Sequence, residues 1–174
     1  MNPDYSPGLT SEVYLALGSK EARFVTNQTN SRIEVSRIVD APAVRIFMFL
    51  SHADNHPRFD TSGMVRASAD HAVLDRPGMV FVMEMHDETK GDHHLEHHLV
   101  VFQPGRAIGW APAEPGRDPA GHTFVWRLVP LDGQCTLVTQ TYSHLDLGDL
   151  PPVVDREQLR ISLDRLADAV TGGA

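Results

Sequence analysis

Short alternating segments, separated by turn-forming residues, fill the second half of this chain and limit what it can fold into. Six such runs lie at residues 64–69, 79–86, 94–102, 107–110, 123–129 and 136–143. Most of the connections are short and rich in Pro and Gly, as at Arg76-Pro77-Gly78, Lys90-Gly91 and Pro104-Gly105. Parallel strands need long crossovers, usually helical, for which these connections are too short. The pattern therefore predicts an antiparallel meander.

The segments on either side of the meander supply one more strand and several helices. Residues 32–39 alternate apolar and polar positions, which predicts a strand. Pro42 then opens a short helix that runs to residue 50, and a second short helical or irregular stretch covers residues 53–60. At the end of the chain, apolar residues spaced four, three and four apart predict one amphipathic helix of roughly 15 or more residues. These residues are Leu159, Leu163, Leu166 and Val170.

Composition excludes several classes of partner. The 174 residues fit one ordinary domain, and a net charge of −8 gives no attraction to nucleic acid or to an anionic membrane surface. One cysteine, Cys135, excludes an intrachain disulfide framework and indicates a reducing compartment. No apolar run is long enough to insert in a membrane, and the N-terminus lacks the layout of a signal peptide. We therefore expect a cytoplasmic protein.

The first 30 residues differ from the rest. Pro, Gly, Ser and Asn are frequent at both ends of this segment, and residues 11–25 between them can form one short helix. We expect residues 1–30 to be an arm, ordered only in part, and residues 31–174 to be a single domain. The arm is a candidate contact for a homodimer.

Several segments together resemble one known superfamily. They are IEVSRIVDAPAVRIFMFL, NHPRFDTSG, GMVFVMEMH, VVFQPGRAIGW, HTFVWRLVP and TLVTQTY. With the C-terminal helix they cover residues 32–170 and resemble the SRPBCC superfamily, also called the START or birch-pollen-allergen-like helix-grip fold. Within it, the chain looks most like the bacterial polyketide cyclase/dehydrase or lipid-transport-like group. The resemblance implies an α+β fold: a seven-stranded antiparallel sheet wraps around the long C-terminal helix, with two short helices after the first strand and an apolar cavity inside.

A hairpin near residue 90 allows the two faces of the sheet to be assigned. If Thr89-Lys90-Gly91 forms a three-residue loop, His86 pairs with His94 and Met83 with His97. One face then carries Met79, Phe81, Met83, Met85, Leu95, His97, Leu99 and Val101. This face is apolar apart from His97, so we expect it to line the cavity. A slip of one residue would reverse every side chain.

His97 is therefore the main catalytic candidate. An imidazole on an apolar face can act as a general acid or base, or hold a ligand oxygen, although it can equally be a core histidine bonded to a backbone carbonyl. Tyr142 is the second catalytic candidate, because a phenol beside a cavity can donate to a ligand carbonyl. Its face is uncertain, since Leu137 and Thr139 define an equally reasonable alternative. The expected ligand-binding residues are Phe81, Met83, Met85, Leu99, Trp110, Trp126, Gln140 and His56.

Two further histidine patterns have competing interpretations. His94, Glu96 and His98 share the opposite face in a spacing that suits zinc, but that face is expected to be solvated. We therefore expect no metal, and the absence of a dinucleotide fingerprint predicts no cofactor. His56 and Asp60 lie four residues apart and can form a dyad, although Pro57 makes a regular helix between them doubtful.

Two functions fit these features. One is a cofactor-independent enzyme, similar to aromatase/cyclases, that binds a hydrophobic polyketide-like or aromatic molecule and catalyses cyclisation and dehydration. The other is a non-catalytic carrier or sensor of a lipid or other small molecule. One inward polar group favours the carrier, whereas several convergent ones favour the enzyme. A co-chaperone or dimeric interaction module is a third class, which would explain the N-terminal arm.

Overall fold

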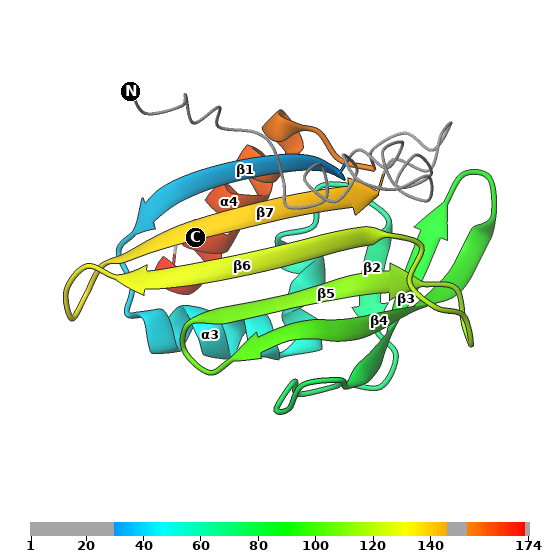
Figure 1. The fold of residues 1–174 in the computed structure, drawn as a ribbon, viewed down its shortest axis with the longest axis horizontal. Coiled ribbons are helices and arrows are strands. Elements are labelled where there is room, and N and C mark those ends of the chain that lie inside the picture. The colour runs from blue at the N-terminus through cyan, green and yellow to red at the C-terminus, as the bar shows by residue number, and fades with distance from the viewer. Residues whose placement is uncertain (1–29, 146–152, 173–174) are drawn as a thin grey trace, which may run out of the picture.

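The computed structural model describes residues 30–145 and 153–172, so the predicted arm lies outside the described residues. Seven strands form one antiparallel sheet in the order β1-β7-β6-β5-β4-β3-β2 (Figure 1). The strands are β1 (Asn30–Val39), β2 (Val65–Ser68), β3 (Val80–Asp87), β4 (Gly91–Gln103), β5 (Ala107–Ala113), β6 (His122–Pro130) and β7 (Thr136–Leu145). The helices are α3 (Ala43–Ser51), the 3-10 helix η1 (Ala53–Arg58) and α4 (Arg156–Thr171). This arrangement confirms the predicted α+β helix-grip fold.

Helix α4 has strong local signals at both ends. Asp155 accepts a hydrogen bond from the backbone N–H of Gln158, and the Gln158 side chain accepts one from the backbone of Asp155, which forms a capping box. Gly172 ends the helix with φ of 81°, a conformation that suits glycine. The predicted stripe is buried: Leu159, Leu163, Leu166 and Val170 are all at most 2% exposed. No helix in the described ranges has the length and apolar character required to span a bilayer.

The β3–β4 hairpin differs from the predicted register by two residues. Asp87 pairs with Gly91, so Phe81 lies opposite His97 and Met83 opposite Leu95. The reason is the Asp87 side chain, whose Oδ1 accepts hydrogen bonds from the backbone N–H groups of the next turn at 2.8 and 2.6 Å. Because the shift is even, every side chain stays on its expected face. His97 therefore points inward.

A β-bulge in β4 corrects one part of the face assignment. Leu99 pairs with Trp110 and Val101 with Gly109, so Val100 is the extra residue. Beyond a bulge the two faces exchange. Phe102 is consequently the residue that enters the core, where its ring lies 5.6 Å from that of Phe47. The expectation that Val101 belongs to the inner face was wrong.

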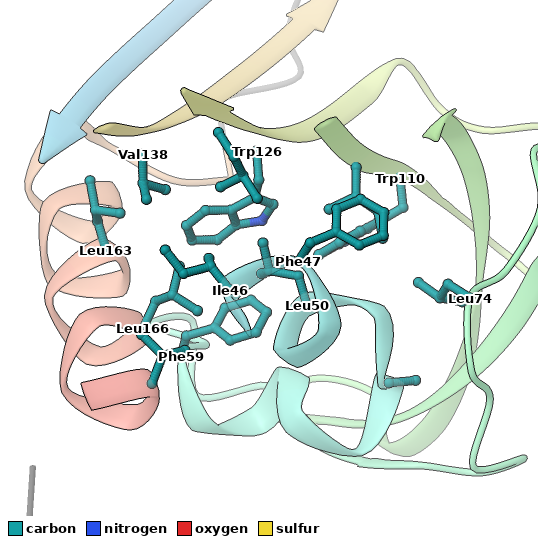
Figure 2. Close-up of a cluster of buried hydrophobic side chains, with 14 of the residues drawn as sticks. Ile46, Phe47, Leu50, Phe59, Leu74, Trp110, Trp126, Val138, Leu163 and Leu166 are labelled. Carbon is teal, nitrogen blue, oxygen red and sulfur yellow. The ribbon is translucent and has the colours of Figure 1, made fainter. Parts of the chain in front are cut away.

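The core fills one end of the concave face. Trp126 is completely buried, and Figure 2 shows its ring between Leu163 of α4 and Leu50 of α3. Helix α3 contacts β5 and β6 as well as α4. Its apolar residues occupy this end of the sheet and leave the other end free for a cavity.

The two edge strands of the sheet are unlike each other. β2 has four residues, and its pairing with β3 shifts register between Val65 and Ala67. β1 is regular and pairs along its whole length with β7. Two side-chain contacts join β1 to α4: Arg156 donates to the backbone oxygen of Glu34 at 2.9 Å, and Arg37 pairs with Asp164 at 2.6 Å. The β2 edge is therefore short and irregular, and the β1 edge is joined to α4 by charged side chains.

Gly109 lies where β5 passes very close to β6. A Cβ atom there would lie 2.7 Å from the backbone oxygen of Phe124 and 3.0 Å from the Cα atom of Val125. Gly109→Ala should therefore push the strands apart and lower the free energy of unfolding by about 1–3 kcal/mol. Gly133→Ala is the matched control, because no atom lies within 4 Å of its Cβ position, and it should change stability by less than about 0.5 kcal/mol. Equal urea midpoints for the two variants would contradict this.

Candidate functional site

A cavity of about 280 Å³ lies on the concave face, between the strands, η1 and the beginning of α4. Its wall is mainly apolar, and Met64, Val65, Met85, Leu95, Trp110, Phe124, Val154 and Leu159 contribute to it. Ser62, Glu114, Ala120 and Val153 line it and are also solvent-exposed, which places the entrance among them. The entrance therefore lies between the segment after η1, the β5–β6 connection and the residues that precede α4.

His97 is a buried polar group without a partner. It is 5% exposed, it lines the cavity, and its ring lies 5.1 Å from that of Phe81. Neither ring nitrogen has a hydrogen-bond partner among the described residues. Burial, together with repulsion by the neighbouring His56 and His98, lowers the pKa of His97 to about 3. The ring is therefore neutral at pH 7, with one donor and one acceptor nitrogen that no described residue satisfies.

His56 enters the same cavity from η1. Its Nε2 donates to the backbone oxygen of Leu50 at 2.9 Å, which leaves Nδ1 as an acceptor. The ring stacks on Trp110 with centroids 4.4 Å apart, and burial lowers its pKa to about 4. The considered dyad with Asp60 does not form, because the Asp60 carboxylate accepts from Ser62 and from the backbone of Val65 instead.

The Tyr142 hydroxyl is occupied within the protein. It accepts from the backbone N–H of Val153 at 3.1 Å and shares a hydrogen bond of 2.8 Å with Nδ1 of His122. The Tyr142 ring is fully buried and does not line the cavity, which differs from the predicted ligand contact. His122 lines the cavity in its place. Its ring stacks on that of Tyr142, which in turn stacks on the ring of His144. Burial and the neighbouring His144 lower the pKa of His122.

Gln140 adds a second unsatisfied group. Its side chain is 4% exposed, and Nε2 contacts Oγ of Ser162 on α4 at 3.4 Å. Within the described part of the chain, Oε1 is buried without a hydrogen-bond partner. Gln140 and Ser162 both line the cavity, so an unpartnered acceptor belongs to a residue of its wall.

The remaining predicted ligand contacts divide into two groups. Met85 and Trp110 line the cavity, whereas Phe81, Met83, Leu99 and Trp126 do not and are buried in the core beside it. Of the two tryptophans, Trp110 thus forms cavity wall, whereas Trp126 belongs to the core alone. Residues 122 and 124 of β6 were not predicted as site residues, although they alternate with Trp126 on the same face.

Among the described residues, the charged side chains that line the cavity are acidic, and basic side chains contact them from outside the lining. No Lys or Arg lines the cavity in the ranges that the structure describes, whereas Asp60 and Glu114 do. Glu114 forms an ion pair with Lys90 at 2.6 Å, and Arg165 donates to the backbone oxygen of Asp60. The wall therefore combines neutral imidazoles inside with carboxylates near the entrance.

The histidines of the opposite face do not converge. His94 is exposed, and Nε2 of His98 lies 3.9 Å from Glu96. His86 instead pairs with Asp92 at 2.6 Å. Residues 30–145 and 153–172 contain no group of three or more His, Cys, Asp or Glu side chains arranged to hold a metal ion.

Comparisons with known proteins agree on the architecture. No protein-family model matches the chain, and no curated protein is similar to it in sequence. Solved structures do match. One is norcoclaurine synthase from Thalictrum flavum in complex with dopamine and hydroxybenzaldehyde, with a TM-score of 0.58 at 13% identity. The match covers 86% of this chain and 91% of that one. The Zhui aromatase/cyclase from a Streptomyces species has a TM-score of 0.50 at 20% identity, over 83% and 93%. The chain has the helix-grip fold of the SRPBCC superfamily.

This result confirms the predicted helix-grip fold. A third helix-grip structure, the Aha1 dimer from Colwellia psychrerythraea, has a TM-score of 0.52 at 14% identity, over 82% of this chain and 98% of that one. Because all three identities are below 25%, these similarities show the fold alone. The activity of this helix-grip domain has to be inferred from its own cavity.

Proposed function

We propose that this helix-grip domain binds an apolar, at least partly aromatic small molecule in its cavity. The observation that carries the proposal is a cavity of about 280 Å³ with an apolar wall, aromatic side chains and a few inward polar groups. Small-molecule sites have this composition, because apolar surface supplies affinity and a few polar groups supply orientation. Trp110 and Phe124 contribute aromatic side chains to this wall.

Catalysis of cyclisation and dehydration is a second candidate, favoured by one observation. Three imidazoles, of His56, His97 and His122, line one cavity together with Gln140, which is more than the single inward histidine expected of a carrier. A neutral imidazole such as His97 can donate to a developing enolate oxygen, as neutral histidine does in known isomerases. In this proposal His122 carries the proton and Tyr142 orients it through the 2.8 Å hydrogen bond.

Binding is tested with the uncharged fluorescent probe N-phenyl-1-naphthylamine. We expect one saturable site per chain. Leu95→Trp, in the half-buried cavity wall, should weaken binding at least about tenfold because the larger ring fills space that the probe needs. Val129→Trp is the matched control, because Val129 is 53% exposed and does not line the cavity. Equal affinities for both variants, with folding verified by circular dichroism, would place the probe elsewhere.

The catalytic candidate needs the natural ligand. Native mass spectrometry of the protein from its own host would identify a retained molecule, which is then incubated with fresh protein. Aldol closure followed by dehydration forms one carbon–carbon bond and releases one water from the substrate. Loss of one water that depends on His97 and His122 would support the enzyme, and an unchanged ligand would support the carrier.

A further inference from the structure

We propose that the cavity selects an uncharged aromatic molecule that carries a hydroxyl group, in preference to a carboxylate of the same skeleton, and that His97 determines this choice. The inference rests on the proposed binding function and adds the chemical class of the ligand.

The unpartnered groups of the wall define what the ligand has to supply. His97 contributes one donor and one acceptor, and Gln140 Oε1 contributes a second acceptor; none of these atoms has a partner in the described residues. A buried polar atom without a partner is unfavourable, so a ligand that completes these bonds gains affinity. A hydroxyl both donates and accepts, which matches a neutral imidazole. A carboxylate only accepts, so it cannot satisfy an acceptor nitrogen or the amide oxygen.

The charges disfavour a carboxylate independently. Among the described residues that line the cavity there is no Lys or Arg to neutralise a buried anion. The carboxylates of Asp60 and Glu114 lie at its wall, and Lys90, outside the lining, is paired with Glu114 at 2.6 Å. His97 could serve as a counter-ion only in its protonated form. Its burial opposes that form, and so do the neighbouring His56 and His98. A carboxylate in this cavity would be a buried charge without a partner, which is strongly unfavourable.

The position of His97 makes it the residue that a hydroxyl meets. His97 lies on β4 opposite Pro112 of β5. Trp110 lies two residues before Pro112 on β5 and on the same face of the sheet. A ligand ring in the part of the cavity beside Trp110 therefore has its substituents close to the His97 imidazole. Gln140 is on β7, which β5 and β6 separate from β4, so it faces another part of the same ligand.

The test uses three probes with one skeleton: 2-naphthol, 2-methylnaphthalene and 2-naphthoate, each displacing N-phenyl-1-naphthylamine at pH 7.5. For the unmodified protein we expect 2-naphthol to bind about tenfold more tightly than 2-methylnaphthalene, and 2-naphthoate to bind most weakly. His97→Leu should leave 2-methylnaphthalene binding within about threefold and remove most of the advantage of 2-naphthol. Phe81→Leu, which changes an apolar neighbour of His97, should preserve that advantage.

The outcomes separate the inference from the function on which it rests. If 2-methylnaphthalene or 2-naphthoate binds the unmodified protein as tightly as 2-naphthol, the inference is overturned while ligand binding stands. If neither the fluorescent probe nor any naphthalene binds, the proposed function itself fails. The unmodified protein already decides the hydroxyl preference, and His97→Met replaces His97→Leu if that variant does not fold.

Discussion

Shortening Leu163 to alanine should lower the free energy of unfolding by about 2–5 kcal/mol, the range for removing a buried leucine side chain. Leu163 is 2% exposed on α4 and packs in the cluster that contains Trp126 and Val138 (Figure 2). The loss combines the transfer of the removed carbon atoms to water with the cavity left behind, which the surrounding helix and sheet cannot fill completely.

Urea denaturation of Leu163→Ala and Leu131→Ala measures the effect against a matched control. Leu131 is 53% exposed in the β6–β7 connection, so its replacement should change stability by less than about 0.5 kcal/mol. A loss below 1 kcal/mol for Leu163→Ala would mean that α4 does not hold the sheet in the way its buried stripe indicates.

Acidification from pH 7.5 to pH 4.5 should destabilise the fold strongly through two buried imidazoles. Burial lowers the pKa of His97 to about 3 and that of His56 to about 4, both from 6.5. The unfolded chain therefore takes up protons below pH 6.5 that the folded chain excludes. The stability that the neutral rings confer is complete above pH 6.5 and is lost as the pH falls toward 4, by about 2–3 kcal/mol for each ring at pH 4.5.

Two variants separate this effect from general acid denaturation. His97→Leu removes one of the two groups, so its loss of stability between pH 7.5 and 4.5 should be smaller by about 2–3 kcal/mol. His94→Gln removes an exposed histidine of the same strand and should behave like the unmodified protein. Parallel stability curves for all three proteins would show that His97 is not held neutral by the fold.

The architecture could be predicted from the sequence because apolar residues recur with one period in helices and with another in strands. The apolar spacing of α4 and the alternation of the strands specify which side of each element is buried. The β3–β4 register was wrong by two residues, since the Asp87 side chain closes the turn earlier than the glycine alone suggests. An even shift leaves the faces intact, so the inward orientation of His97 followed from the pattern. The bulge at Val100 could not be foreseen, because one extra residue leaves no mark on the composition of the strand.

The alternation of apolar residues predicts which face of a strand is buried. It does not predict whether a residue of that face lies at the core end or at the cavity end. The inner face has one end filled by α3 and another end open as the cavity, and residues of the same pattern belong to both. Phe81 and Trp126 thus lie in the core, while Trp110 and Phe124 line the cavity. His122 was missed because its link to Tyr142 depends on the β6–β7 register, which no local signal in the sequence specifies.

The two edge strands of the open sheet also affect whether copies of the protein aggregate at high concentration. An unpaired strand edge is a template onto which a second copy can add its own strand. β2 offers only four residues and breaks its register, so it presents few aligned backbone groups. β1 is longer, but Arg156 already binds the backbone oxygen of Glu34, and the Arg37–Asp164 ion pair joins this strand to α4. A strand from a second copy would have to displace these charged side chains before it could pair with β1. These contacts therefore disfavour polymerisation by successive strand addition.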